Sequence, residues 1–229
     1  MMKTAWRVIF PAIVMLLVVA APSRSETMAP AGEPVSRDLK QVLDRLQHHY
    51  RETNSFTGKF SEEITTVGAP TRKRQGTFSF RKPGRMRWDF EDPEKQTVVS
   101  DGETLYSYDP DLNQVVETPL KQALKSSSAT SFLLGIGNIN RDFKAAFANP
   151  GTANGLIDLI LDARTGGYKI EVGLDPKMYN LMTLTLTDQL GDVTKIDFSD
   201  IHDNVKLPDS IFAFKAPAGA DIVTAPASP

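Results

Sequence analysis

The 229-residue sequence contains no cysteine. A disulfide framework, a thiol-based active site and lipid attachment through an N-terminal cysteine are therefore excluded. A chain without disulfide bonds has to be held together by an apolar core or an extensive sheet. Its length is enough for one domain with such a core, or for two small ones.

Histidine is also scarce, with three residues in the whole chain. His48 and His49 fall on the polar side of a predicted helix, and His202 lies between Asp200 and Asp203 in the sequence. None of the three has a second ligand at the spacing that metal sites use. We interpret all three as solvated surface residues and expect no metal site.

Motifs for catalysis and for cofactor binding are missing as well. The chain has no Gly-x-Ser-x-Gly elbow, no Walker loop and no dinucleotide fingerprint after a strand. Asp109, Asp111 and Asn113 resemble the start of a calcium loop, but Gln114 occupies the position of its required glycine. The sequence therefore predicts no catalytic site and no cofactor, and we do not expect an enzyme.

Long apolar runs are confined to the N-terminus. Residues 8–21 are nearly all apolar and follow the basic residues Lys3 and Arg7. This run of 14 residues is shorter than the roughly twenty that a helix needs to cross a bilayer. Small residues around Ser25 suit a signal peptidase. We therefore predict that residues 1–25 are a cleaved secretory signal and not a membrane anchor.

The chain has no excess of positive charge. Its formal net charge is −2, and loss of residues 1–25, which hold three basic and no acidic side chains, would make it −5. Binding to nucleic acid or to an anionic membrane surface would require a basic patch. We therefore expect a soluble mature protein that does not bind nucleic acid.

One amphipathic segment precedes the rest of the pattern. Residues 26–34 are small and proline-rich, which predicts a flexible leader. Ser36 is a suitable N-cap for a helix over residues 37–52. The apolar stripe of this helix recurs at helical spacing and consists of Leu39, Val42, Leu43, Leu46 and Tyr50. We expect the stripe to pack on a sheet face.

From Ser55 onward the apolar period changes to two, the period of a strand. Turn signals such as Asp101-Gly102 separate the segments, and connections this short join antiparallel neighbours. The predicted strands are residues 56–64, 75–82, 85–90, 96–100, 104–108, 114–118, 156–163, 168–174, 179–189, 193–201 and 212–215. Residues 216–229 are rich in alanine and proline, and we predict that they are disordered.

Residues 120–147 interrupt the strands. We expect a helical turn over residues 120–125 and, after the apolar run 130–137 with its two glycines, a helix from Asn138 to about Phe147. Such an insertion forms either a mobile lid or an ordinary crossover that plugs the core.

About eleven antiparallel strands form a sheet that has to close or curl strongly. A barrel of that width is too wide for its own side chains to fill, so it needs covers. Residues 37–52 and 120–147 are the available covers. The predicted fold is mainly β: a single domain over residues 35–215 that forms an incomplete antiparallel β-barrel lidded by α-helices.

Four short motifs in the predicted sheet occur in a specific order and spacing. They are Arg81-Lys82-Pro83, Arg87-Trp88-Asp89, Val99-Ser100-Asp101-Gly102 and Leu105-Tyr106-Ser107-Tyr108-Asp109-Pro110. Together they resemble the periplasmic outer-membrane lipoprotein carrier family, LolA. The resemblance is clearest over residues 56–147 and extends over most of the chain after the predicted signal.

The resemblance implies a monomeric periplasmic carrier without a cofactor. Such a carrier takes lipoproteins from a LolCDE-like inner-membrane ABC transporter, holds their acyl chains in an apolar cavity and passes them to a LolB-like outer-membrane acceptor. The residues that it implies for the lining are Phe78, Phe80, Met86, Trp88, Phe90, Val98, Phe132, Leu133, Leu134, Ile136 and Phe143. Taken by themselves, apolar stripes at period two are also typical of an ordinary core. The alternative function is a periplasmic lipid- or lipoprotein-sensing module of the same fold.

The family also has a functional arginine immediately before the proline of the basic-basic-Pro corner, and this arginine ties the lid to the barrel. Here that position is Lys82, which is preceded by Arg81. A lysine lacks the planar fork of an arginine, but Lys82 shares its face with Phe78 and Phe80. The resemblance implies that Lys82, helped by Arg81, hydrogen-bonds carbonyls of residues 132–137 when the cavity is empty.

Overall fold

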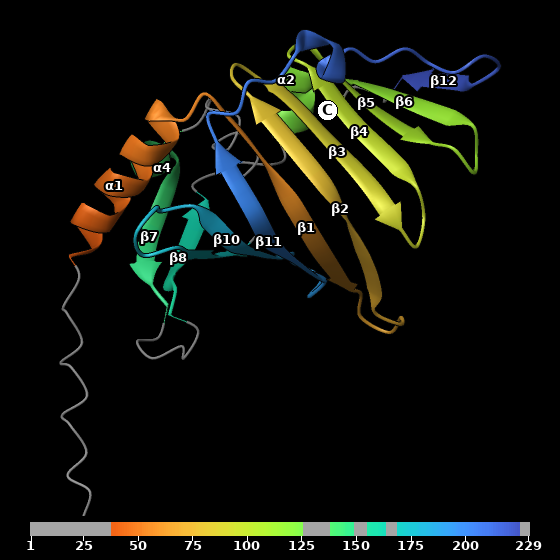
Figure 1. The fold of residues 1–229 in the computed structure, drawn as a ribbon. Coiled ribbons are helices and arrows are strands. Elements are labelled where there is room, and N and C mark those ends of the chain that lie inside the picture. The colour runs from red at the N-terminus through yellow and green to blue at the C-terminus, as the bar shows by residue number, and fades with distance from the viewer. Residues whose placement is uncertain (1–37, 126–137, 149–154, 164–168, 225–229) are drawn as a thin grey trace, which may run out of the picture. The chain divides into compact units, whose positions relative to one another are not determined.

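A sheet of twelve strands dominates the part of the chain that the computed structural model describes, which is residues 38–125, 138–148, 155–163 and 169–224 (Figure 1). The spatial order is β12-β6-β5-β4-β3-β2-β1-β11-β10-β9-β8-β7, so the edge strands β12 and β7 are not joined. All neighbours pair antiparallel except β12 and β6, which are parallel. The predicted fold class is confirmed, with one more strand and one parallel pair.

The strands follow one another along the chain at short intervals. Their bounds are β1 Ser55–Thr65, β2 Arg72–Arg81, β3 Arg85–Asp92, β4 Gln96–Asp101, β5 Thr104–Asp109, β6 Gln114–Pro119, β7 Phe143–Phe147, β8 Ile157–Ala163, β9 Lys169–Leu174, β10 Leu181–Thr187, β11 Val193–Asp203 and β12 Asp221–Thr224. The described helical elements are α1 Leu39–Glu52, α2 Leu120–Lys125, α4 Ile139–Asp142 and the 3-10 helix η1 Asp209–Phe212. Ten of the predicted strands and the helical turn over residues 120–125 are confirmed.

Helix α1 carries the predicted apolar stripe but begins two residues later than expected. Its N-cap is Asp38, whose carboxylate accepts a hydrogen bond from the Lys40 amide at 3.0 Å, whereas Ser36 lies outside the described residues. The buried side chains of α1 are Val42, Leu43, Leu46 and Tyr50. They join apolar residues of β7–β10 in one core, so α1 covers this half of the sheet (Figure 1).

The predicted helix from Asn138 to Phe147 is wrong over its second half. Asn138 does cap a helix, because its side chain accepts from the Arg141 amide at 3.0 Å, but α4 ends after one turn at Asp142. Phe143–Phe147 then forms β7 against β8. The spacing of the two phenylalanines fits both periods, since residues i and i+4 share a face in a helix and in a strand. Pairing with β8 decides between them, so the predicted lid segment 120–147 includes a strand of the sheet.

The C-terminal predictions are also wrong in two places. Residues 212–215 do not form a strand, because the 3-10 turn η1 ends at Phe212, whose side chain is buried. The tail expected to be disordered from residue 216 forms β12, while residues 225–229 lie outside the described part. The Asn113 side chain fixes its approach by donating to the Gly219 carbonyl at 2.8 Å. The free edge of β6 supplies the backbone partners that composition alone does not reveal.

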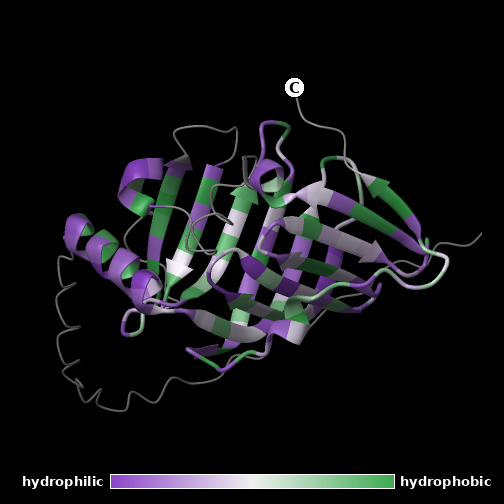
Figure 2. Ribbon diagram, turned by 90° about the horizontal axis from the view of Figure 1, so that it is seen from above, coloured by the Kyte–Doolittle hydropathy of each residue, from purple (hydrophilic) through white to green (hydrophobic). Residues whose placement is uncertain are grey.

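Alternation gives the sheet two chemically different faces, and Figure 2 shows hydrophilic and hydrophobic residues alternating along its strands. We call the face that α1 packs against the inner face and the opposite one the outer face. The buried core of the inner face consists of Phe56, Phe60, Phe78, Phe80, Met86, Phe143, Ile157, Leu159, Leu161, Ile170, Val172, Leu174, Leu181, Leu184 and Phe198. This core extends from β7 to β3 without interruption.

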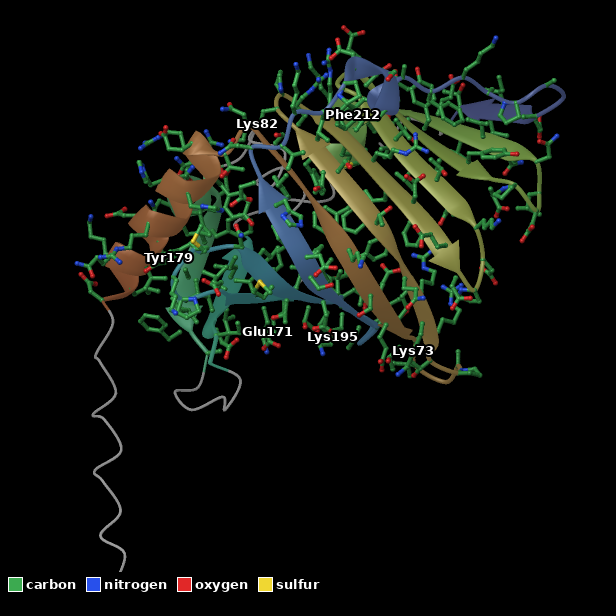
Figure 3. All side chains as sticks on the ribbon, in the orientation of Figure 1. Lys73, Lys82, Glu171, Tyr179, Lys195 and Phe212 are labelled. Carbon is green, nitrogen blue, oxygen red and sulfur yellow. The ribbon has the colours of Figure 1, made fainter. Side chains whose placement is uncertain are left out.

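A second, smaller core lies on the outer face. Val99 of β4 and Val115 of β6 are fully buried, and Phe212 of η1 is 1% exposed. Figure 3 places Phe212 beside β3 and β4, away from α1. Farther along the chain, the ring of Phe214 stacks on that of Tyr106 with centroids 5.1 Å apart. The segment after β11 therefore covers the outer face of β3–β6 and does not cover their inner face.

Candidate functional site

Aromatic side chains gather on the inner face of β1–β3. Phe60 makes edge contacts with Trp88 and Phe90, with ring centroids 4.7 and 5.0 Å apart. The ring centroids of Phe78 and Trp88 are 5.6 Å apart. The Phe78 ring crosses Gly58 of the neighbouring strand so closely that a Cβ there would stand 2.7 Å from a ring carbon. Gly58 therefore leaves the space that the Phe78 ring occupies.

Burial divides the residues that the sequence implies for a lipid-binding lining. Phe78, Phe80 and Met86 are at most 5% exposed and act as core in this conformation. Trp88, Phe90 and Val98 pack against the same core but remain half-buried: Trp88 is the register partner of Val98, and Phe90 lies on the same face. We call these three residues the open aromatic patch. Phe143 lies in another part of the core, and the remaining predicted lining residues, Phe132, Leu133, Leu134 and Ile136, lie outside the described part of the chain.

Two small apolar spaces lie on the inner face of the described residues. A cavity of about 30 Å³ lies under α1 and α4, between Leu46, Phe143 and the strands, and is lined by apolar residues and Tyr50. A second of about 10 Å³ lies next to Phe78 and Phe80. One water needs roughly 10–15 Å³ in this measure, so neither space admits an acyl chain. Two larger hollows, of about 390 and 310 Å³, are lined by largely polar residues of β1, β2, β3 and β11, including Ser61 of the outer face. Among the described residues, the two small cavities therefore cannot hold a long apolar ligand, whereas the open aromatic patch offers it a partly exposed surface.

Lys82 fastens the C-terminal end of α1. It directly follows β2, and its ammonium group donates a hydrogen bond to the carbonyl of Tyr50 and lies 3.4 Å from that of Arg51. Carbonyls in the last turn of a helix have no partner within the helix, and basic side chains bind them favourably. Burial lowers the pKa of Lys82 from its ordinary value, although Glu52 raises it in part. The implied acceptors, residues 132–137, lie outside the described residues, so the acceptors seen here are those of α1.

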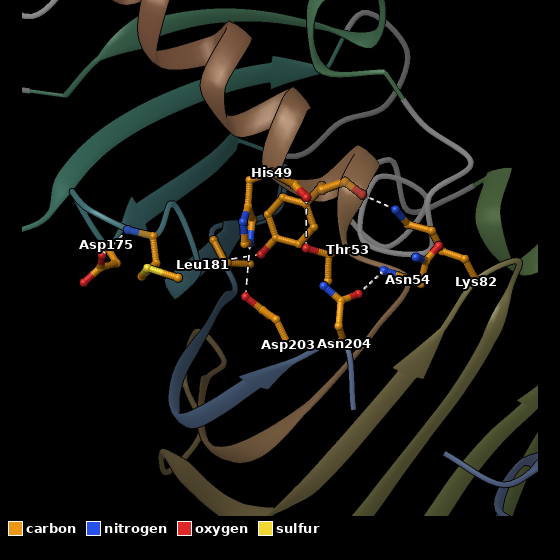
Figure 4. Close-up of polar contacts among 10 residues, drawn as sticks. His49, Thr53, Asn54, Lys82, Asp175, Leu181, Asp203 and Asn204 are labelled. Carbon is orange, nitrogen blue, oxygen red and sulfur yellow. Dashed lines mark hydrogen bonds and ion pairs between the residues drawn. The ribbon is translucent and has the colours of Figure 1, made fainter. Parts of the chain in front are cut away.

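Three further contacts fix the same helix end, and Figure 4 shows them together. The Tyr50 hydroxyl accepts a hydrogen bond from the buried Leu181 amide at 3.1 Å. The Thr53 hydroxyl donates to the His49 carbonyl at 2.9 Å. The Asn54 amide donates to the Asn204 side chain at 2.8 Å. The end of α1 is thus tied to the start of β10, and the residue that precedes β1 is tied to Asn204, which follows β11.

The interpretation of His49 as a solvated residue is wrong. Its side chain is 15% exposed, and its Nε2 atom lies 3.7 Å from a carboxylate oxygen of Asp203, beyond a normal hydrogen bond. Burial lowers the pKa of His49 and outweighs Asp203, which raises it. His49 lies three residues after Leu46 and seven after Val42, so helical spacing places it at the border of the apolar stripe. This spacing is the feature of the sequence that could have predicted the burial of His49.

Arg81 does not take part in this arrangement. It points to the outer face, where its guanidinium donates to the Leu207 carbonyl at 2.6 Å and to Asp209 at 2.5 Å. The same group lies over the Phe212 ring, 5.0 Å from its centroid. The expectation that Arg81 helps Lys82 is therefore wrong, because adjacent strand residues point to opposite faces. Arg81 instead holds the C-terminal segment on the sheet.

Two negative findings apply to the described residues alone. None of their helices is long and apolar enough to cross a membrane. Their histidine and acidic side chains do not form any cluster of three or more that is placed to hold a metal ion.

Comparison with known proteins gives one consistent family. Residues 51–215 match the family model described as outer membrane lipoprotein carrier protein LolA. A relative from Methylobacillus flagellatus, named outer-membrane lipoprotein carrier protein, is 32% identical over 183 residues, which cover 79% of this chain and 88% of the relative. A protein of the same name from Cupriavidus pinatubonensis is 34% identical over 190 residues, which cover 81% of this chain and 88% of that protein.

One solved structure shares the fold. The crystal structure of an uncharacterized conserved protein from Thermus thermophilus has a TM-score of 0.54 and covers 81% of this chain and 98% of its own. Its sequence identity to this chain is 12%, so this likeness concerns the fold alone.

Proposed function

Because the chain belongs to the LolA family of outer membrane lipoprotein carrier proteins, we propose that it carries lipoproteins through the periplasm with their acyl chains on the inner face. One observation supports this proposal above the others: the open aromatic patch continues an apolar face that the sheet does not itself cover. Uncovered apolar surface next to a core is typical of a binding site. The activity proposed is binding and transfer, without a chemical step.

The route through the cell is part of the proposal. Residues 1–25 direct the chain to the periplasm, a LolCDE-like transporter of the inner membrane supplies the lipoprotein, and a LolB-like acceptor of the outer membrane receives it from the monomeric carrier. The family and the predicted signal support this route. N-terminal sequencing of the protein purified from periplasm checks the first step: we expect a start near Glu26, and a retained Met1 would contradict it.

Transfer is the deciding experiment. Mature protein is loaded with an acylated lipoprotein and mixed with outer-membrane vesicles that contain the acceptor, and the lipoprotein that reaches the vesicles is measured. We expect transfer of the acylated form and none of a form without acyl chains. A sensing module of the same fold would bind the lipoprotein but retain it.

A pair of substitutions connects transfer to the inner face. Trp88→Asp places a charge on the open aromatic patch, where an apolar chain would have to desolvate it. Leu190→Asp introduces the same charge at an 82% exposed residue of the β10–β11 turn. We expect Trp88→Asp to lose binding and transfer while it stays folded, and Leu190→Asp to keep both. If both variants transfer equally well, acyl chains do not use this face.

A further inference from the structure

A charged network lies on the inner face, at the end of the strands opposite Lys82. Arg74 of β2 is the register partner of Glu62 of β1, and its Nε and Nη2 atoms lie 2.7 and 2.6 Å from one Glu62 carboxylate oxygen. Its Nη1 atom donates to the Gln96 side chain at 3.0 Å, and Gln96 donates to the Ser107 hydroxyl at 3.1 Å. We call Glu62, Arg74, Gln96 and Ser107 the inner-face polar network.

The network borders the open aromatic patch directly. The Arg74 guanidinium stacks on Phe90, with its central carbon 4.1 Å from the ring centroid. Gln96 is the register partner of Phe90, and Ser107 is that of Val98. Figure 3 labels the two ends of β2: Lys73 marks the end where the network lies, and Lys82 the end at α1. The inner face is therefore apolar between two polar ends.

The position of the Glu62–Arg74 pair is unusual for an ion pair of this sheet. Its side chains are 10% and 23% exposed. The next pair of the same two strands, Glu63–Lys73, points to the outer face with exposures of 46% and 75%. Removing an ion pair from water costs several kcal/mol per ion, and apolar residues often replace such a pair without loss of stability. A gain in stability therefore does not by itself account for an ion pair at this position, which favours a role in binding.

We propose that the inner-face polar network binds the carbonyl oxygens of the ester or amide bonds through which acyl chains are joined to a lipidated ligand. This inference rests on the proposed function. The Nε–H group of Arg74 donates to Glu62, one N–H group of Nη1 donates to Gln96, and Nη2 forms the ion pair with Glu62, so at least one N–H group on each terminal nitrogen has no further acceptor among the described residues. Glu62 neutralises the charge of Arg74, which suits an uncharged carbonyl, whereas a phosphate group would be repelled by the Glu62 carboxylate.

The length of the apolar stretch agrees with this assignment. Eight residue spacings separate Arg74 from Lys82, about 26 Å along a strand at ~3.3 Å each. One leaflet of a bilayer, which holds the acyl chains of a lipid, has a hydrocarbon thickness of about 15 Å. A chain whose carbonyl is bound at Arg74 can thus lie on Phe90 and Trp88 and end before it reaches Lys82.

An ester and its ether analogue test the proposal, because they differ only in the carbonyl. The mature protein is saturated with the hydrocarbon probe diphenylhexatriene, which has no polar group, and is titrated with dioctanoylglycerol or with dioctylglycerol. We expect the ester to displace the probe about tenfold more tightly, which corresponds to about 1.4 kcal/mol. Equal displacement by the two lipids would overturn the proposal.

Variants assign the preference to the network. Arg74→Met should abolish the preference for the ester, and the double variant Glu62→Met/Arg74→Met, which leaves no unpaired charge, should do the same if the single variant does not fold. Lys73→Met, on the same strand but on the outer face, should keep it. A preference that survives in the double variant would show that the carbonyl is bound elsewhere.

Two further outcomes separate this inference from other possibilities. If dioctanoyl phosphatidic acid displaces the probe more tightly than dioctanoylglycerol, and Arg74→Met removes that difference, the network is a phosphate site and the carbonyl assignment is wrong. If the probe does not bind, or neither lipid displaces it, the proposed function itself fails. Displacement without preference leaves the proposed function intact and refutes the network alone.

Discussion

Replacement of Lys82 by methionine tests how the empty carrier is held closed. The substitution keeps the length of the side chain but removes the ammonium that donates to the Tyr50 carbonyl. A hydrogen bond to a charged group contributes about 1.5–3 kcal/mol. Burial lowers the pKa of Lys82, which shows that desolvation offsets part of this gain, so we take about 1.5 kcal/mol, from the lower end of that range.

For a ligand that has to displace α1, the effect on binding follows from a two-state equilibrium between a closed form and an open form, of which only the open form binds. The apparent affinity is then the intrinsic affinity multiplied by the open fraction. A loss of about 1.5 kcal/mol from the closed form raises that fraction about tenfold as long as the closed form predominates. We therefore expect Lys82→Met to bind diphenylhexatriene about tenfold more tightly and to pass lipoprotein to the acceptor more slowly.

The assay combines probe titration with amide hydrogen exchange over residues 39–52, which reports opening of α1. Lys195→Met is the matched control, because Lys195 is half-exposed and pairs with Asp197 on the outer face. An unchanged probe affinity in Lys82→Met, together with faster exchange in α1, would refute the reasoning, since the helix would then open without making the site available. Unchanged exchange would show that Lys82 does not hold α1.

Three further outcomes are expected. Burial lowers the pKa of His49, so the folded state favours the neutral imidazole. The contribution of His49 to stability is therefore fully present above its ordinary pKa of about 6.5 and is lost as the pH falls below that value. Thermal unfolding between pH 7 and 5 should show this loss in wild type and in His48→Gln, but less in His49→Gln. Arg81→Met should lower the unfolding free energy by about 1–3 kcal/mol through its lost contacts to the C-terminal segment, with probe affinity unchanged; altered affinity would place Arg81 in the lipid site. Gly58→Ala should cost about 1–3 kcal/mol in chemical denaturation, because the new Cβ meets the Phe78 ring and the Ser199 carbonyl oxygen, and full stability would show that both give way without cost.

The sequence predicts the strands well because their signals are local. Alternation and the turns at Asp101-Gly102 and after Asp109 determine β3–β6 almost to the residue. β7 and β12 are different, since each forms by pairing with the outer edge of another strand. The partner of β7 is β8, and that of β12 is β6. Neither Phe143–Phe147 nor Asp221–Thr224 carries a pattern that excludes its alternative.

The candidate site is likewise predictable from the sequence only in part. Alternation shows which face a residue occupies, so it correctly separates Lys82 from Arg81 and brings Phe78, Trp88 and Phe90 together. It does not reveal which residue lies opposite another in the neighbouring strand. The pairing of Glu62 with Arg74 depends on the register of β1 and β2, and the acceptors of Lys82 depend on where α1 ends. The partners of the polar residues at both ends of the inner face are therefore visible only in the fold.

A carrier that must release its ligand needs a closed form that a ligand can open at moderate cost. The contact from Lys82 contributes about 1.5 kcal/mol, and the hydrogen bond between the Leu181 amide and Tyr50 contributes about 1 kcal/mol. Burial of a methylene group contributes about 0.8 kcal/mol, so a few methylene groups offset these two polar contacts, and further ones have to replace the apolar contacts of Val42, Leu43, Leu46 and Tyr50. An acyl chain has many more, and it can open the carrier while the closed form still lowers its net affinity.

The strength of this closed form should depend on the geometry of the basic group. Lys82 acts as a single point charge, whereas an arginine presents a planar fork that can bind the carbonyls of Tyr50 and Arg51 at once. We therefore expect Lys82→Arg to slow amide exchange in α1, to weaken probe binding severalfold and to speed transfer to the acceptor. These three changes are opposite in sign to those of Lys82→Met. If Lys82→Arg instead binds the probe as tightly as Lys82→Met does, any change of the lysine opens the helix, and the site depends on the fit of its side chain and not on hydrogen bonds to the end of α1.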